Sequence, residues 1–423
     1  METYGKILLI AMPAFLFFVL LEKWWSWYKD KDTVRNMDMV SSLSSGITNV
    51  TKDVLGLSIS IITYRWLMGK VAIVHVQSTL LTYVIAFIVL DFAGYWMHRW
   101  SHHINFFWNL HIIHHSSEEF NLACALRQSI STVVNFFTFL LLPAALLGVP
   151  AKVIAIVAPL HLFAQFWYHT RHIKKMGVLE KIFVTPSHHR VHHAINKEYL
   201  DKNLSQIFII WDKLFGTFQE ELSEVPPVYG ITRPVQTWNP IKINFQHLWL
   251  LMKDAWRTKS WKEKFTLWFK PTGYRPPDVV ERYPVYKIEN VYQFEKYAPK
   301  APVPLQIWSW IQMTALLLFI SWLFANIAKI GSPDMFYYGG FVFLSVYAYT
   351  ELMDRSPYAI AWEAMKNILG IVVIYQQGDW FGISQLNPFL NNIIIAYFIL
   401  ATLATGWFVY LHWKEDQQMA VNI

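Results

Sequence analysis

The chain has 423 residues, of which 54% are hydrophobic and only 15% charged, with 21 Trp, 21 Tyr and 30 Phe. Soluble domains carry about 25% charged residues, so we expect much of the surface to face lipid. The net charge of +7 fits phosphate headgroups, and no basic run or zinc-finger spacing favours a nucleic-acid partner. A single cysteine, Cys124, excludes an intramolecular disulfide framework and a multi-cysteine metal site.

Apolar runs that could cross a membrane occur along the whole chain. The first, residues 7–21, contains Pro13 and follows an acidic Glu2, so we predict a retained anchor and not a cleaved signal peptide. Several runs are shorter than the roughly 20 residues that a perpendicular membrane helix needs. The pattern predicts an all-α polytopic membrane protein with about seven to nine membrane helices. The further runs cover residues 54–68, 80–97, 133–149, 153–168, 305–330, 335–349, 360–375 and 389–411.

The runs at 133–149 and 153–168 are separated by Pro150 and Ala151, which predicts a helical hairpin. Its two ends would emerge on one side of the membrane, so residues 101–132 and the stretch from His169 onward would share that side. The loop of residues 22–35, with three lysines and Arg35, falls on the same side. The positive-inside rule places this side in the cytoplasm. The basic residues of the later stretch include Lys174, Lys175, Lys181, Lys197, Lys202, Arg257, Lys259, Lys262 and Lys264.

Histidines gather in one part of the chain, with 13 of the 16 between His98 and His193. Three groups have helical spacing, "HRWSH", "HIIHH" and "HRVHH". Residues three and four apart project from one face of a helix, so each group can present two or three imidazoles to one point. The hairpin brings all three groups to the same side. These eight side chains are His98, His102, His111, His114, His115, His189, His192 and His193.

The three groups indicate a metal site with more than one ion. Ionisable residues near a membrane mark function by default, and imidazole suits Fe, Zn, Cu and Ni. Eight ligands exceed the four that one tetrahedral zinc takes, so two ions are implied. No HExxH motif is present, so the zinc-protease interpretation lacks its general-base glutamate. On chemical grounds, nitrogen ligands beside an apolar pocket suit iron that activates dioxygen.

The spacing HX3H, HX2HH, HX2HH resembles the fatty acid hydroxylase/sterol desaturase superfamily of membrane di-iron oxygenases. The strings "HHSSEEFN", "TPSHHRVHH" and "WDKLFGTF" are similar to those of its alkylglycerol monooxygenase subgroup. The similarity continues weakly through "YGITRPVQTWNP" and the C-terminal helices, and its specific part lies between Asp91 and Phe218. The resemblance therefore covers most of the chain.

The resemblance implies that two iron ions are bound by the eight histidines of the three boxes. Related enzymes use further ligands between the second and third boxes, and His169 in "QFWYHTRH" matches a family histidine, so it joins the expected set. His172 is a further candidate, with a solvated interfacial histidine as the alternative. His188 would support or compete with its neighbour, and His103 stands where some relatives carry an acidic residue.

Four other polar residues are candidates for supporting roles. Glu118 could orient ligating imidazoles, as carboxylates commonly do, or belong to an exposed acidic turn. Asp91, two turns before the first box, is expected to accept a hydrogen bond from an imidazole N–H. Asp201 and Asn203 in "YLDKN" are expected to hold the third box in place, although a turn or helix cap would give the same pattern.

The reaction that the resemblance implies is hydroxylation of the ether-bearing carbon of an alkylglycerol, with O2 as oxidant and tetrahydrobiopterin as electron donor. No pterin-binding motif is readable, so that cofactor rests on the resemblance. A fatty acyl, sterol or carotenoid hydroxylase or desaturase of the same superfamily is the alternative. A membrane metal-binding or transport protein is the alternative of another class, but transporters place polar groups at the bilayer midplane, whereas these histidines gather at one face.

The expected organisation has four regions. Residues 1–79 form N-terminal membrane helices, and residues 80–220 form a di-iron core with the three histidine boxes. Residues 221–303 form a cytoplasmic loop region. Residues 304–423 form C-terminal membrane helices that serve as a scaffold or as an oligomer contact.

Overall fold

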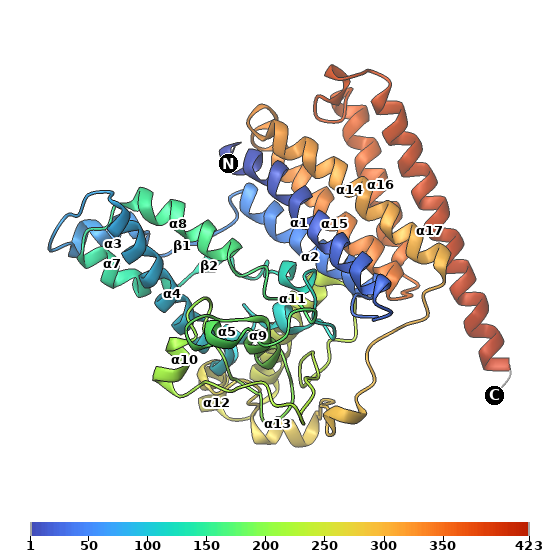
Figure 1. The fold of residues 1–423 in the computed structure, drawn as a ribbon. Coiled ribbons are helices and arrows are strands. Elements are labelled where there is room, and N and C mark those ends of the chain that lie inside the picture. The colour runs from blue at the N-terminus through green and yellow to red at the C-terminus, as the bar shows by residue number, and fades with distance from the viewer. Residues whose placement is uncertain (1, 422–423) are drawn as a thin grey trace.

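The computed structural model describes residues 2–421, and the regular secondary structure of these residues is helical apart from one short pair of strands and three isolated β-bridges. It has a long helical bundle, a smaller apolar lobe beside it, and a cap that joins the two (Figure 1). The all-α prediction is confirmed. The strands, β1 (Ile59–Ser60) and β2 (Val134–Asn135), pair in parallel and tie the lobe to the rest of the chain.

The bundle joins the two ends of the chain. Its N-terminal helices pack against α14 and α15, and Val40, Phe324, Tyr349 and Trp380 are among its fully buried core side chains. Pro304 in the first turn starts α14, and Gly331 with φ +66° ends it. The bundle helices are α1 (Glu2–Tyr28), α2 (Asn36–Val54), α14 (Val303–Ile330), α15 (Asp334–Met353), α16 (Ala359–Gln377) and α17 (Leu390–Val421).

The apolar lobe is built around α4, the helix that carries the first histidine box. Its core contains Ala86 and Val153, where α4 packs on α8. The turn before α8 needs glycine, because Gly148 has φ +60° and an added Cβ would lie 2.0 Å from Val74 O. The lobe helices are α3 (Tyr64–Val71), α4 (Leu80–His103), η2 (Phe137–Leu141), α7 (Leu142–Leu146) and α8 (Ala151–Phe163).

Among the described residues, four helices are long and apolar enough to cross a membrane, namely α1, α4, α14 and α17 up to Gln418. The predicted number of seven to nine is therefore too high. The run at 54–68 is not one helix, because the chain leaves α2 at Val54 and turns at Gly56, with φ +67°, into β1. The run at 133–149 forms β2 and then η2 and α7, which have five residues each. Helix α8 has 13 residues, too few to cross alone.

The predicted hairpin nevertheless returns the chain to its starting side. The segment before it and the segment after it meet where His114 Nε2 lies 3.3 Å from His169 Nε2. The loop after α1 reaches the same place, because Thr33 Oγ1 lies 3.3 Å from His172 Nε2 and Asn121 donates to Thr33 O. The segments expected to share one side of the membrane therefore lie together in the structure. The assignment of that side to the cytoplasm stays a prediction.

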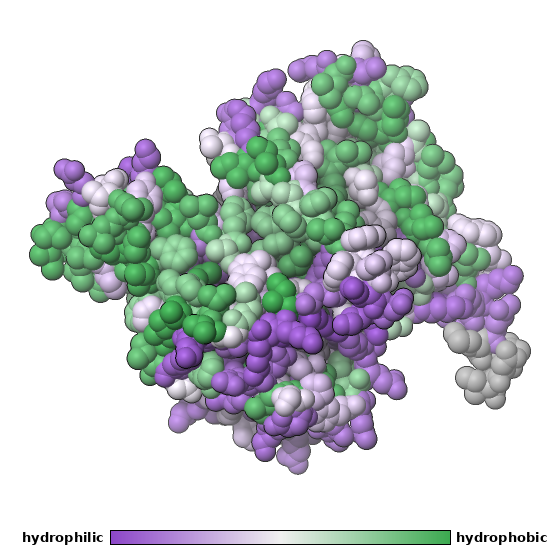
Figure 2. Space-filling model, viewed as in Figure 1, coloured by the Kyte–Doolittle hydropathy of each residue, from purple (hydrophilic) through white to green (hydrophobic). Residues whose placement is uncertain are grey.

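The cap consists of short helices and ordered loops. Figure 2 shows hydrophilic residues gathered over it, below the hydrophobic surfaces of the bundle and of the lobe. The end of α15 holds the cap directly, because Asp354 accepts hydrogen bonds from Trp238 N and from Tyr297 Oη. The cap elements are α5 (Asn105–Trp108), α6 (Ile112–His115), η1 (Cys124–Leu126), η3 (Gly177–Lys181), α9 (Pro186–His192), α10 (Ile210–Phe215), α11 (Pro240–Arg257), α12 (Trp261–Thr266), η4 (Leu267–Phe269), α13 (Pro277–Arg282) and η5 (Val291–Gln293).

Candidate metal centre

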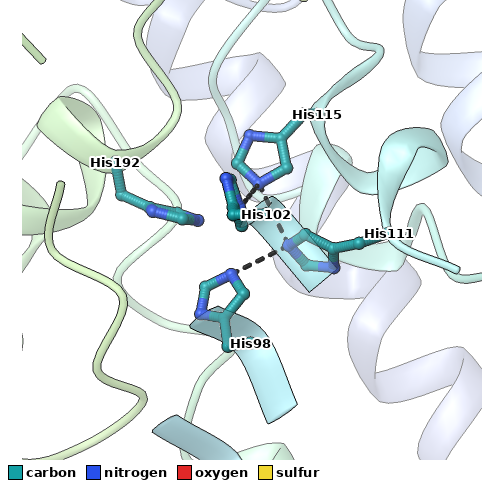
Figure 3. A group of neighbouring side chains, drawn as sticks. All are labelled: His98, His102, His111, His115 and His192. Carbon is teal, nitrogen blue, oxygen red and sulfur yellow. Dashed lines mark hydrogen bonds between the residues drawn. The ribbon is translucent and has the colours of Figure 1, made fainter. Parts of the chain in front are cut away.

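The fold brings the nine histidines expected as ligands into two adjoining groups. In each group, one ring nitrogen per residue lies within 4.8 Å of the corresponding nitrogens of the others. Figure 3 shows the larger group, in which the imidazoles from α4, from the α5–α6 region and from α9 point toward one another. The larger group is His98, His102, His111, His115 and His192, and the smaller is His114, His169, His189 and His193.

Short helices achieve this convergence. The i,i+4 pair of the first box lies on the last turns of α4, where both side chains are buried. Pro186 at the start of α9 and Thr185 before it begin the third box as a helix of two turns. That helix sends His192 into the larger group and His189 into the smaller one. A single helix therefore serves both groups.

The outward-facing nitrogens fix the tautomers of five histidines. Each Nδ1 lies against an oxygen that can only accept, so it must carry the proton, and Nε2 keeps a lone pair directed inward. These contacts are His98 with Leu204 O at 2.7 Å, His102 with Asp201 Oδ1 at 3.0 Å, His114 with Arg127 O at 3.3 Å, His169 with Gln165 O at 3.0 Å and His192 with Lys202 O at 3.0 Å.

The inward nitrogens fit a bound cation. Both His114 and His169 donate through Nδ1, yet their Nε2 atoms lie 3.3 Å apart with no proton left to share. Burial lowers the pKa of each imidazole to about 3, so both are neutral. His192 Nε2 is buried without a hydrogen-bond partner. Facing lone pairs repel unless a positive charge lies between them, and neutral imidazole is a common metal ligand.

The two groups are close enough to act together. The rings of His115 and His193, one from each group, stack with centroids 4.4 Å apart. A donor set of five plus four nitrogens suits two ions better than one, because a single tetrahedral site uses four ligands. The groups lie where α4 enters the cap, not midway along a membrane helix.

Asp201 has a role that the sequence interpretation missed. It was expected to hold the third box, but its Oδ1 accepts from His102 Nδ1, in the first box. Its backbone has φ +57°, a conformation that Asp adopts more readily than most residues. A carboxylate that holds a ligating imidazole fixes the ring orientation and raises its basicity.

Asn203 contacts the third box, which it was expected to hold in place. Its side-chain nitrogen donates to His188 O in α9 at 3.0 Å and to Gln219 O at 2.7 Å, and its Oδ1 accepts from Gln219 N. The side chain is fully buried, with φ +53°. It therefore anchors the backbone of the third box and does not face the imidazoles of the centre.

Asp91 accepts from an imidazole, as expected, but from His161, which belongs to neither group, at 2.8 Å. It also accepts from Ile207 N, Phe208 N and the indole nitrogen of Trp211, at 2.8 to 3.1 Å. Asp91 thus joins α4 to α8 and to the start of α10. Its effect on the centre is indirect.

The motif "WDKLFGTF" contains Asp212, which holds the backbone beside the first histidine box. Asp212 accepts hydrogen bonds from Leu204 N at 2.7 Å and from Ser205 N at 2.8 Å. These bonds fix the segment whose Leu204 O accepts a hydrogen bond from His98 Nδ1. Gly216, with φ +75°, ends α10 and returns Thr217 to Asp212. Sequence reasoning did not identify Asp212, because its target is a backbone group.

Glu118 does not orient an imidazole in the described part of the chain. Its Oε2 accepts from Tyr297 N at 2.6 Å, in the segment that leads to α14. The adjacent Glu119 is buried and forms ion pairs with Arg35, Arg171 and Lys296. The pair therefore attaches the second box to the rest of the cap.

Three further histidines lie outside both groups. His172 is partly exposed and contacts Thr33 Oγ1. His188 is buried against the ring of Phe218, 5.6 Å between centroids. His103 is exposed at the end of α4. None of the three belongs to a group of described side chains that could hold a metal ion.

A cavity of about 220 Å³ opens beside the larger group. His102, His115, His192 and His193 form one wall, so both groups reach it. Its other walls combine apolar side chains with cationic ones. They include Trp108, Ile112, Leu250, Leu251, Arg233, Arg275 and Lys287.

Residues 83–217 match the family model described as fatty acid hydroxylase. Over 403 residues the chain is 32% identical to alkylglycerol monooxygenase of Homo sapiens, covering 94% of this chain and 87% of that protein. It is 30% identical over 407 residues to the alkylglycerol monooxygenase of Danio rerio, covering 95% of this chain and 89% of the relative.

A shorter similarity links the chain to ornithine lipid hydroxylase OlsE of Rhizobium tropici. It is 28% identical over 152 residues, 36% of this chain and 46% of that protein. No solved structure matches the chain.

Substituting a histidine of the centre should remove bound metal, whereas substituting a nearby histidine should not. We expect His189→Ala to lose metal from the smaller group, because three nitrogens remain of four. His172→Ala, outside both groups, should keep the full content. Metal analysis of both purified variants beside the parent tests this. Equal loss from both, or from neither, would contradict the assignment.

Asp201→Asn should weaken metal binding without abolishing the fold. An amide holds His102 Nδ1–H less strongly than a carboxylate does, and such changes typically lower metal affinity about 10- to 100-fold. Competition with a chelator measures this affinity. Glu198→Gln, an exposed carboxylate three residues earlier, is the matched control and should leave the affinity unchanged. A parent-like affinity of Asp201→Asn would refute the role.

Glu118→Gln should make stability less dependent on pH. Burial raises the pKa of Glu118 to about 7, so the folded protein retains a proton that the unfolded chain releases between about pH 4.5 and 7. The native state therefore loses stability as pH rises through this window, on the order of 2 kcal/mol. Glutamine still accepts from Tyr297 N but does not titrate.

Thermal unfolding of parent and Glu118→Gln at pH 5 and pH 8 measures this difference. The variant should gain at pH 8 relative to the parent and not at pH 5. Glu289→Gln, at an exposed position, should follow the parent at both pH values. An identical pH dependence in parent and Glu118→Gln would show that the carboxylate is already ionised at pH 5.

Proposed function

The chain belongs to the fatty acid hydroxylase family, among the relatives of alkylglycerol monooxygenase, and from that premise we propose that it is a membrane di-iron monooxygenase that cleaves the ether bond of alkylglycerols. The observation that carries the proposal is the pair of adjoining histidine groups beside a cavity with apolar and cationic walls. The similarity to the human enzyme extends over 94% of the chain, well beyond the histidine boxes.

The nine histidines would hold two iron ions, five around one and four around the other. Imidazole suits several transition metals, so the donor set supports a metal and the family supports iron. Iron bound there would supply the activation of O2 for insertion of one oxygen atom into a C–H bond. The side that carries the centre would face the cytoplasm.

The reaction converts the ether-bearing CH2 of the alkyl chain to CH(OH). One atom of O2 enters the substrate and the other leaves as water, with two electrons and two protons from a donor. The hemiacetal then breaks its bond to the glycerol oxygen, giving a fatty aldehyde and a glycerol derivative. The electron donor in this proposal is tetrahydrobiopterin, which would be oxidised to the dihydro level.

The cavity residues would place the substrate and exclude water. Trp108, Ile112 and Leu250 give the alkyl chain an apolar wall close to His115, while Arg233 and Lys287 stand where a polar headgroup or a reduced pterin can bind. Closing such a site strengthens the electrostatic interactions within it.

Asp91, Glu118 and Asn203 would act as positioning residues in this enzyme. Each is buried and holds backbone around the histidine boxes, and none lines the cavity. We assign residues 80–220 to the metal-binding core, residues 221–303 to the rest of the cap, and residues 1–79 and 304–423 to the helices around them.

A second candidate is hydroxylation of another membrane lipid. The similarity to the ornithine lipid hydroxylase favours it, because that relative, similar over 36% of the chain, is named for a different lipid. The same centre and cavity would serve, with a different headgroup in the cationic part.

Aerobic turnover of the purified protein with a long-chain alkylglycerol and reduced tetrahydrobiopterin tests the proposal, with fatty aldehyde as the product measured. We expect about two irons per chain and aldehyde from the parent, and no aldehyde from His189→Ala. Bound iron without aldehyde formation would be consistent with an oxygenase but would exclude either alkylglycerol as the substrate or tetrahydrobiopterin as the donor. A folded protein that binds another metal and no iron would refute the proposal.

A further inference from the structure

The cap carries an exposed apolar stripe along α11. Phe245, Trp249, Met252 and Trp256 follow one another at spacings of four, three and four residues, which places them on one helix face. They are 40%, 58%, 47% and 87% exposed. The other face of the helix is buried in the cap through His247, Leu250, Leu251 and Asp254. Both faces of α11 are therefore rich in large apolar side chains.

The stripe continues into α12 and η4. Trp261, Phe265 and Phe269 are 73%, 68% and 72% exposed. The two parts meet at the turn, because Lys264 Nζ donates to Trp256 O at 3.1 Å. Seven exposed apolar side chains on one short segment form a patch of the kind that marks an interaction site. We call residues 245–270 the α11–η4 face.

The charge of this segment is basic. Between Phe245 and Lys270, six basic residues accompany two acidic ones, and one of those, Asp254, is neutralised by Arg275 in a buried pair at 2.5 Å. Exposed Trp and Phe interleaved with Lys and Arg are typical of helices that lie in the headgroup layer of anionic membranes. The basic residues are Lys253, Arg257, Lys259, Lys262, Lys264 and Lys270.

The depth of the segment agrees with this. Helix α4 is a candidate membrane span that ends at His103, and the next residues pair with the end of the α11–η4 face. Asn105 N donates to Lys270 O at 2.9 Å, and Ile104 forms an antiparallel bridge with Pro271. Figure 1 shows α12 at the foot of α4. The face thus lies at the level where a spanning helix leaves the bilayer.

We propose that the α11–η4 face lies in the headgroup layer of the membrane that the chain spans, with an anionic lipid surface as its partner. The aromatic side chains enter the upper acyl region, and the lysines contact lipid phosphates. Anchoring this face would also fix the position of the cavity relative to the membrane. Leu250 and Leu251 of α11 and residues 272–275 after η4 line that cavity. Its walls are then held at the depth at which lipid headgroups lie.

Site-specific fluorescence in the full chain tests the proposal. In a Cys124→Ala background, Phe265→Cys is labelled with an environment-sensitive fluorophore, and the protein is placed in nanodiscs whose lipids carry a quencher near the headgroup. We expect quenching of about twofold or more at this position. Glu281→Cys, exposed on α13 and outside the face, is the matched control and should stay unquenched. Metal content equal to that of the parent shows that each variant keeps a folded cap.

Equal, weak quenching at both positions would overturn the proposal, and so would strong quenching at both, since the face would then not be distinguished from the rest of the cap. Nanodiscs of neutral and of anionic lipid test the electrostatic part. We expect the emission of the Phe265 probe to shift further to the blue in anionic lipid, and Lys259→Glu with Lys262→Glu to remove that difference. An emission independent of lipid charge would exclude anionic lipid as the partner.

Discussion

The structure depends on one electrostatic constraint, which is that neutral imidazole nitrogens converge in a buried space with their lone pairs facing one another. His114 and His169 show it most clearly, since each gives its proton outward and their Nε2 atoms remain 3.3 Å apart. Such an arrangement favours a cation at its centre. Binding of a metal there would be coupled to folding of the cap, because the nitrogens converge only once three distant segments have come together.

Much of the surrounding structure supplies acceptors for the outward protons. Most of these acceptors are backbone carbonyls, which must themselves be held in place, and buried carboxylates and amides do this. Asp212 fixes the segment whose Leu204 O meets His98, and Asn203 fixes the backbone of α9. Asp91 on α4 accepts a hydrogen bond from Ile207 N and so holds the segment that follows Leu204 against α4. Asp91 and Asn203, which are candidate site residues in the sequence, thus support the centre indirectly, by holding backbone segments in place.

The long bundle and the cap form one unit. Asp354 at the end of α15 holds the backbone of Trp238, and Glu118 beside the second box holds the backbone of Tyr297 in the segment that leads to α14. The C-terminal helices consequently pack against α1 and α2 and also fasten the cap. This arrangement fits the similarity to the alkylglycerol monooxygenases, which extends through these helices and not through the histidine boxes alone.

The sequence by itself determined the helical class, the membrane setting and the eight histidines of the three boxes, because hydrophobic runs and i,i+3/i+4 spacing are local properties. The ninth histidine, His169, was expected only from the family resemblance. The sequence overestimated the number of membrane helices, since apolar composition does not reveal that the chain turns at Gly56 just after α2 or that the run at 133–149 divides into short elements. Tertiary structure alone decided how the nine histidines divide into groups of five and four, and that Asp201 serves His102 while Glu118 serves a backbone amide. Those partners lie up to 179 residues apart in the chain, and no local pattern encodes which distant backbone group a side chain will meet.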